Sequence, residues 1–114
     1  MNITIWHNPR CAKSRQTLEL LRNRGIEPEV VDYLKNPPTR SELRRVLDLL
    51  DLPAHALMRH KETAFKEQGL SDRDDEATLV EAMIHNPVLI ERPVVITEDN
   101  AIIGRPPENV LAII

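Results

Sequence analysis

The sequence of 114 residues contains a single cysteine, Cys11. One cysteine cannot form an internal disulfide, and small secreted domains usually carry several. The composition therefore excludes a disulfide-stapled extracellular domain. We expect a reducing, cytoplasmic location in which Cys11 is a free thiol at rest.

Long apolar runs are also lacking, because no segment approaches the ~18 apolar residues that a membrane span requires. The first residues show no basic region followed by a long apolar stretch, which argues against a signal peptide. The net charge is only -3 and 29% of the residues are charged, so neither a general nucleic-acid binder nor a disordered chain is indicated. We expect no nucleic acid or membrane among the partners, and a monomer, since no large apolar stripe is left over after helix packing.

A hydrophobic content of 41% suffices for one modest core, so we expect a single domain spanning residues 1–114. Short β-branched runs predict strands at residues 2–6, 29–33, 94–97 and 101–103. Helical spacing and stop signals predict five helices. The first runs from Cys11 to Gly25, and the second begins at the Thr39–Glu42 capping box and ends near residue 50. The others lie at residues 54–60, between the acidic run 71–76 and Asn86, and at residues 107–114. The order is β-α-β, then helices, then β-β-α.

Cys11 follows a predicted strand and a polar loop, and it lies where the first helix begins. Unpaired N–H groups and the positive end of the helix dipole favour a thiolate there and can also hold an oxyanion. Arg10, Lys13 and Arg15 would each lower the thiol pKa further if their side chains turned toward it. A lone cysteine is more often inert and buried, but these polar neighbours favour an exposed nucleophile.

The spacing around Cys11 excludes two other thiol chemistries. A phosphatase-type loop has five residues between cysteine and arginine, and Thr17 occupies that arginine position. A dithiol pair needs a second cysteine three residues on, where the chain has Ser14. Disulfide exchange within the chain is therefore impossible.

The segment His7–Arg15 resembles the nucleophile loop of the glutaredoxin-dependent arsenate reductases, the ArsC family. Three further motifs match in order: Arg59 after the central helices, Arg92–Pro93 opening a strand, and Gly104–Pro106 near the C-terminus. The resemblance covers essentially the whole chain. Ala12–Lys13 after the nucleophile is similar to the housekeeping YfgD-type members, whereas dedicated resistance enzymes commonly have Gly-Thr.

This resemblance implies an α/β, thioredoxin-like fold: a mixed four-stranded sheet with a helical insertion between the βαβ and ββα halves. Pro93 would be a cis-proline facing the nucleophile loop. The implied activity is arsenic detoxification, in which Cys11 attacks arsenate, glutathione adds as co-substrate, glutaredoxin releases the thiol and arsenite leaves, with no bound cofactor. The single cysteine agrees, since reducing As(V) to As(III) takes two electrons and a second thiol must come from another molecule.

The resemblance also implies that Arg59, Arg92 and Arg105 bind the oxyanion with planar, permanently charged donor groups. Taken singly, each arginine is better explained as a surface residue or a salt bridge, so their joint placement carries the assignment. Supporting roles fall to His7, Ser14, Arg15 and Pro93. His7 would lower the thiol pKa or fix the loop, and the Ser14 hydroxyl would donate to the thiolate or cap the helix.

Two alternatives of other classes stay open. A Spx-like regulator that binds RNA polymerase would share the fold, but its redox switch normally uses two cysteines. A monothiol glutaredoxin-like oxidoreductase would share the single thiol, but a mixed disulfide does not need three arginines. The histidines at positions 55, 60 and 85 show no ligand spacing with Cys11, so we expect no metal.

Overall fold

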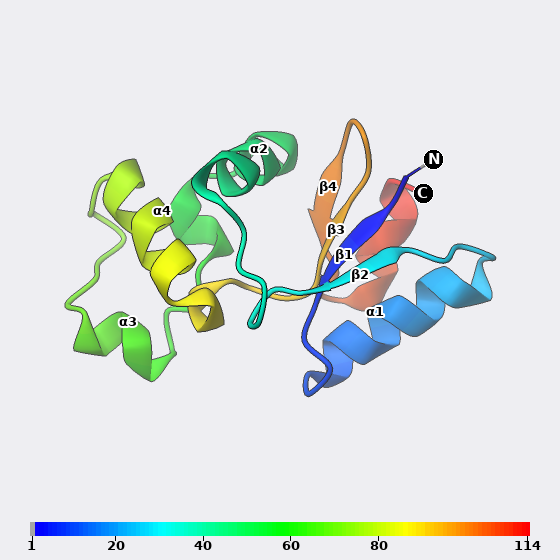
Figure 1. The fold of residues 1–114 in the computed structure, drawn as a ribbon, viewed down its shortest axis with the longest axis horizontal. Helices are drawn as coiled ribbons and strands as arrows, with labels where there is room; N and C mark the ends of the chain where they lie inside the picture. Colours follow the sequence, from blue (N-terminus) through cyan, green and yellow to red (C-terminus); the bar gives the residue numbers. More distant parts are fainter. Residues whose placement is uncertain (1) are drawn as a thin grey trace. The chain divides into compact units, whose positions relative to one another are not determined.

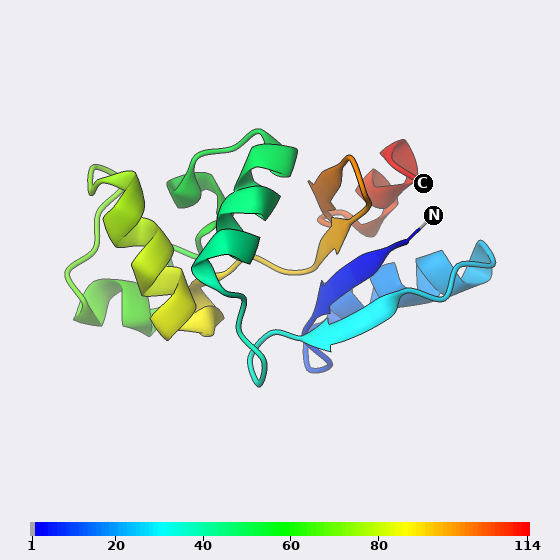
Figure 2. The ribbon, with the colours of Figure 1, turned by 45° about the horizontal axis from the view of Figure 1, so that its top comes forward.

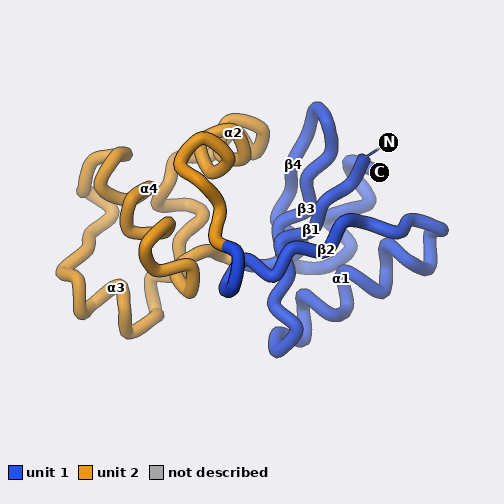
Figure 3. The backbone as a smooth tube through the Cα atoms, viewed as in Figure 1, with its two compact units in different colours: residues 1–36, 92–114 blue, residues 37–91 orange. Residues whose placement is uncertain are grey.

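The computed structural model describes residues 2–114, which divide into two compact units (Figure 3). Residues 2–36 and 92–114 form the sheet unit, and residues 37–91 form the helical unit. No helix in the described part of the chain is long and apolar enough to cross a membrane. The helical unit is inserted between the second and third strands along the chain, as predicted.

The sheet unit contains a mixed four-stranded sheet in the order β2-β1-β3-β4 (Figure 1). The strands are β1 (Thr4–His7), β2 (Glu29–Asp32), β3 (Val94–Ile96) and β4 (Ala101–Ile103). β1 is parallel to β2 and antiparallel to β3, and β3 is antiparallel to β4. This arrangement confirms the predicted thioredoxin-like fold and places β1, which leads into the thiol loop, in the middle of the sheet.

Two helices pack beside this sheet (Figure 2): α1 (Ala12–Asn23) contacts β1, and η3 (Pro107–Ala112) contacts β4 and α1. Alternate residues of the strands point toward these helices. The core between them is formed by Ile3, Ile5, Leu21, Val95 and Val110. η3 is a 3-10 helix that ends at Ala112, two residues short of the predicted α-helix.

The helical unit consists of α2 (Arg40–Leu50), η1 (Ala54–Leu57), α3 (Thr63–Glu67), α4 (Glu76–His85) and η2 (Pro87–Leu89). α4 packs against α2, η1 and η2. The predicted capping box is confirmed, because the Glu42 N–H donates to Thr39 Oγ1 at 3.1 Å and the Thr39 N–H donates to Glu42 Oε1 at 3.0 Å. The Asp75 carboxylate caps α4 by accepting from the N–H of Thr78 at 2.7 Å.

Three details of the helical unit differ from the predictions. The expected helix at 54–60 is a 3-10 helix that stops at Leu57, because Met58 turns extended and forms a β-bridge with Ile90. Helix α3 was not predicted, since five residues around one buried apolar side chain, Phe65, give no periodic pattern. In the acidic run 71–76 only Glu76 is helical.

Gly104 links β4 to the C-terminal segment at a place where a larger residue does not fit. A Cβ atom there would lie 2.8 Å from Thr17 Oγ1 and 3.0 Å from Pro93 Cγ. Thr17 is fully buried, so it has little freedom to move. We expect Gly104→Ala to lower the free energy of unfolding by about 1–3 kcal/mol, as overpacking does, measured by urea denaturation.

Removing the obstructing atoms provides the control for this prediction. Thr17→Ala deletes both side-chain atoms of Thr17 that the new methyl group would meet. The loss in the double variant should therefore be smaller than the sum of the two single losses by about 0.5 kcal/mol or more. Strict additivity would show that the cost of Gly104→Ala does not come from this contact.

Candidate active site

The loop after β1 is held by local hydrogen bonds that set where α1 begins. The Cys11 N–H donates to the Asn8 carbonyl at 3.0 Å, and the Arg10 N–H donates to Asn8 Oδ1 at 3.0 Å. The Arg15 guanidinium reaches back and donates to the Pro9 carbonyl at 2.9 Å, so it braces the loop. Cys11 is thus fixed as the N-cap residue of α1, with an extended backbone.

Four donors meet the Cys11 sulfur. Backbone N–H groups of Lys13 and Ser14, from the first turn of α1, and the Arg92 side chain donate to it. Nη1 of Arg105 lies 3.8 Å from Sγ. Cys11 is only 8% exposed, so the prediction of an exposed nucleophile is wrong. The thiol is buried among the helix start and two guanidinium groups, a polar enclosure that the adjacent residues alone do not reveal.

These donors change the acidity of the thiol. Burial raises the pKa of Cys11, but the N–H groups of Ser14 and Lys13 and the charge and hydrogen bond of Arg92 outweigh burial and lower this pKa below its ordinary value. The sequence predicted that Arg10 and Lys13 could lower this pKa, but both residues are exposed to solvent. The cation that lowers the thiol pKa is instead Arg92, which lies two residues before β3.

We expect the rate of Cys11 alkylation by iodoacetamide to follow the thiolate fraction, with a midpoint below the ~8.5 of a free cysteine. Because the pKa is lowered, the thiol should stay reactive as the pH falls from 8.5 toward the midpoint. The measurement is the pH dependence of the alkylation rate, followed by mass spectrometry. A midpoint at or above 8.5 would contradict the arrangement of donors.

His7 and Ser14 form a buried pair behind the loop. His7 Nδ1 lies 2.6 Å from Ser14 Oγ, and the Asn8 N–H donates to the same oxygen at 3.0 Å. Burial lowers the pKa of His7 and outweighs the opposing charge of Asp32, which favours a neutral ring that forms one hydrogen bond with the Ser14 hydroxyl. Neither predicted role of this hydroxyl is seen: it fixes the loop to His7, and only the backbone N–H of Ser14 reaches the thiol.

Arg92 and Arg105 come together from the two ends of the β3–β4 hairpin. Arg92 lies just before β3, and Arg105 follows β4 by two residues. Nη1 of Arg105 also donates to the Arg92 carbonyl at 3.4 Å. The Arg92–Pro93 bond is cis, which confirms that prediction, and the Arg105–Pro106 bond is cis as well.

Arg59, the third predicted arginine, lies in the helical unit after η1. Its Nε donates to Glu62 Oε1 at 2.9 Å, and its Nη1 donates to Glu91 Oε1 at 3.3 Å. The side chain is 23% exposed. Two carboxylates thus hold this guanidinium, and its binding of an oxyanion stays a prediction.

Sequence reasoning did not identify Thr17, or the residues at and after the end of β2, as contributors to the site. The Thr17 hydroxyl donates to the Lys13 carbonyl at 2.8 Å and lies 3.3 Å from the carbonyl oxygen of Gly104, so it joins α1 to the segment that carries Arg105. A pocket of about 430 Å³ adjoins the thiol loop, lined by Asn8, Pro9, Arg10, Asp32, Leu34 and Lys35. No local sequence signal marks Thr17, Asp32, Leu34 or Lys35, because only tertiary structure brings them to the thiol loop.

Comparison with known proteins agrees with this geometry. YfgD of Escherichia coli strain K12, an uncharacterized protein, is 50% identical over 98% of this chain and 96% of its own length. An arsenate reductase of Rhizobium meliloti strain 1021 is 47% identical over 100% of this chain and 82% of its own length.

The structural match is equally extensive. The solved structure of an arsenate reductase from Vibrio cholerae is 46% identical, superposes with a TM-score of 0.96, and covers 100% of this chain and 98% of its own. The model of the ArsC family matches residues 6–113, which include Cys11, Arg92 and Arg105. The chain therefore belongs to the ArsC family.

Proposed function

We propose that the protein reduces arsenate to arsenite in the cytoplasm, with Cys11 as the nucleophile, glutathione as co-substrate and glutaredoxin as protein partner. The observation that carries the proposal is the meeting of helix N–H groups, Arg92 and Arg105 at one sulfur. Such donors stabilise both a thiolate and an oxyanion. The arsenate reductases among the relatives support the choice of oxyanion.

In the first step the Cys11 thiolate attacks arsenic and displaces one arsenate oxygen, which leaves as water after protonation. Arsenic stays As(V), because an As–S bond replaces an As–O bond without electron transfer. Arg92 and Arg105 would neutralise the remaining oxygens and orient the leaving one, since guanidinium groups match planar pairs of oxygens. We expect Arg59 to add a third contact.

The later steps need two external thiols, because the chain offers no second cysteine. The thiol of glutathione displaces another oxygen as water, which leaves arsenic bonded to Cys11 and glutathione. The glutaredoxin thiolate then attacks the glutathione sulfur and forms a mixed disulfide, and the released electron pair reduces As(V) to As(III). Water finally cleaves the remaining As–S bond, which releases arsenite and the Cys11 thiol.

The pocket beside the thiol loop supports the role of glutathione as co-substrate. It adjoins the nucleophile loop and is lined by two cationic residues, Arg10 and Lys35. Glutathione carries two carboxylates and one ammonium group, so two cations and the nearby Asp32 suit its charges. No bound cofactor is needed for the chemistry.

The test is an assay in which NADPH, glutathione reductase, glutathione and glutaredoxin regenerate the thiols. We expect NADPH consumption that depends on arsenate and on every component. Saturating arsenate should also protect Cys11 from alkylation. Equal alkylation with and without arsenate, together with no arsenate-dependent turnover, would remove the assignment. Turnover of glutathionylated protein without arsenate turnover would favour the monothiol glutaredoxin-like alternative. Binding of RNA polymerase without any turnover would favour the Spx-like alternative.

A further inference from the structure

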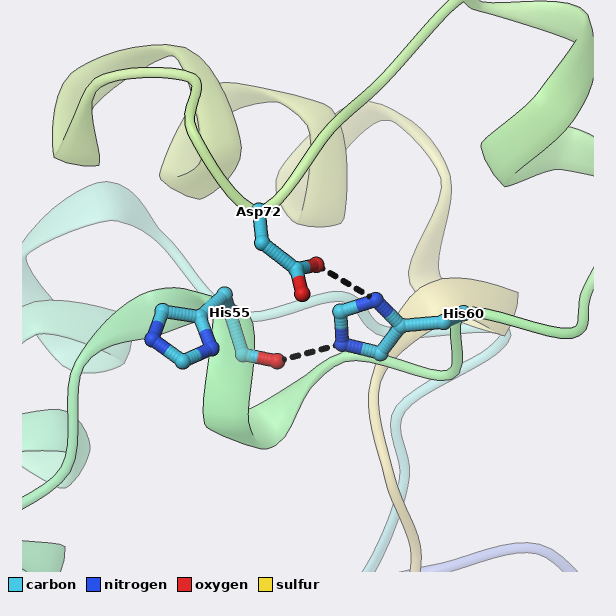
Figure 4. A group of neighbouring side chains, drawn as sticks. All are labelled: His55, His60 and Asp72. Atoms are coloured by element: carbon cyan, nitrogen blue, oxygen red, sulfur yellow. Dashed lines mark hydrogen bonds and ion pairs between the residues drawn. The ribbon is translucent and has the colours of Figure 1, made fainter.

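Three side chains of the helical unit converge at a place that the proposed activity does not use. His55, His60 and Asp72 each offer one ligand atom, and these atoms all lie within 4.8 Å of one another (Figure 4). His55 lies on η1, His60 follows η1, and Asp72 lies in the connection between α3 and α4. The sequence analysis considered only the spacing of the histidines from Cys11. It could not reveal this cluster, because the third ligand is an aspartate from another segment.

The ring of His60 is oriented as in a metal-binding histidine. Its Nε2 donates to the His55 carbonyl at 2.7 Å, and its Nδ1 faces Asp72 Oδ1 at 2.8 Å. The Phe65 ring packs beside it at a centroid distance of 4.8 Å. Ligating histidines commonly donate their other N–H to a carbonyl group, which fixes the ring and its tautomer. Nδ1 of His60 pairs directly with the Asp72 carboxylate, and a metal ion would replace this contact by binding both atoms after Nδ1 loses its proton.

The two segments that carry these residues are also tied together nearby. The Glu76 carboxylate accepts from the Ala54 N–H, with N–O distances of 2.9 and 3.1 Å, and so joins the start of α4 to the start of η1. Figure 4 shows the Asp72 carboxylate lying between the two imidazole rings. The three donors are thus brought together by the backbone before any ion is bound.

We propose that His55, His60 and Asp72 bind one divalent transition-metal ion, with Zn²⁺ as the natural occupant. Two imidazole nitrogens and one carboxylate oxygen suit Zn²⁺, whereas Mg²⁺ and Ca²⁺ prefer oxygen ligands alone. Tetrahedral Zn²⁺ with bonds of about 2.0–2.1 Å sets its ligands roughly 3.3 Å apart. His60 and Asp72 have side chains that are 38% and 61% exposed, so small side-chain rotations can close the remaining distance, and water can fill the fourth position.

Binding would join residues 55 and 60 to residue 72 and so close the segment that carries α3. The test uses full-length, untagged Cys11→Ser protein, so that the thiol cannot bind the metal. Isothermal titration with ZnCl₂ should show one ion per chain with a micromolar or tighter dissociation constant. Amide hydrogen exchange over residues 60–72 should slow when Zn²⁺ is added.

Conservative variants separate a defined site from general histidine binding. His55→Gln and Asp72→Asn should each weaken Zn²⁺ binding by about tenfold or more, with unchanged circular dichroism in the absence of metal. His85→Gln is the matched control, because His85 is exposed and pairs only with Glu81 in the described structure; binding should be unaffected. Absence of stoichiometric micromolar binding, or equal losses in the His55 and His85 variants, would overturn the proposal.

Discussion

Replacing Cys11 with serine is expected to reduce arsenate-dependent turnover roughly a thousandfold or more, as loss of a catalytic nucleophile does. The Cys11 pKa is lowered by the helix N–H groups and Arg92, so the thiol is available as thiolate. A serine hydroxyl stays protonated under the same donors and does not form the As–S bond on which the proposed sequence depends. The measurement is the coupled NADPH assay with variant and wild-type protein at equal concentration.

Misfolding should not explain this loss, because position 11 is the N-cap of α1 and serine is among the preferred N-cap residues. The N–H groups of Lys13 and Ser14 that point at the sulfur can donate to a serine hydroxyl at the same position, so the start of α1 keeps its partners. The thermal unfolding midpoint should be equal or higher than that of wild type. Substantial turnover by a folded Cys11→Ser protein would disprove the nucleophile assignment.

The second large effect is expected for Arg92→Ala. Arg92 lowers the thiol pKa and, in the proposed mechanism, also binds the arsenate oxygens, so its removal should affect activation and oxyanion stabilisation together. We expect kcat/KM for arsenate to fall by about 10²–10³-fold, similar to the loss of an oxyanion donor in other enzymes. The alkylation midpoint of Cys11 should rise at the same time. Steady-state kinetics and the pH dependence of alkylation measure the two effects.

Two further variants separate charge from geometry. Arg92→Lys keeps the positive charge but loses the planar pair of donors, so it should retain a low alkylation midpoint and still lose much of the turnover. Arg24→Ala is the control, because Arg24 is an exposed arginine at the far end of α1. If Arg24→Ala and Arg92→Ala reduce turnover equally, the effect of Arg92 is general electrostatics and not a local contact.

Local patterns in the sequence were sufficient for most of the fold. β-branched runs marked all four strands, and the Thr39–Glu42 box marked the start of α2 to the residue. The patterns failed where an element is short or its shape depends on distant contacts. α3 has one buried apolar side chain, Phe65, and the end of η1 is set by the bridge between Met58 and Ile90.

The sequence predicted which residues form the candidate site, but not which charged groups act on the thiol. The motifs identified Cys11, Arg92 and Arg105, which the structure brings together. Charge near Cys11 in the sequence suggested Arg10 and Lys13, yet Arg92 and Arg105 reach the sulfur from 81 and 94 residues away. Lys13, two residues after Cys11, points to solvent, whereas the sheet topology brings the distant Arg92 and Arg105 to the sulfur.

The buried contact between His7 and Ser14 restricts how this protein could change its chemistry. Ser14 occupies the position that a resolving cysteine would need, so a single Ser14→Cys substitution would supply the second thiol of a dithiol oxidoreductase. That substitution would also remove the oxygen that holds both His7 and the N–H of Asn8, and sulfur is a larger and weaker partner in a fully buried place. An evolutionary path from the one-thiol to the two-thiol mechanism would therefore require compensating changes in the loop that presents Cys11.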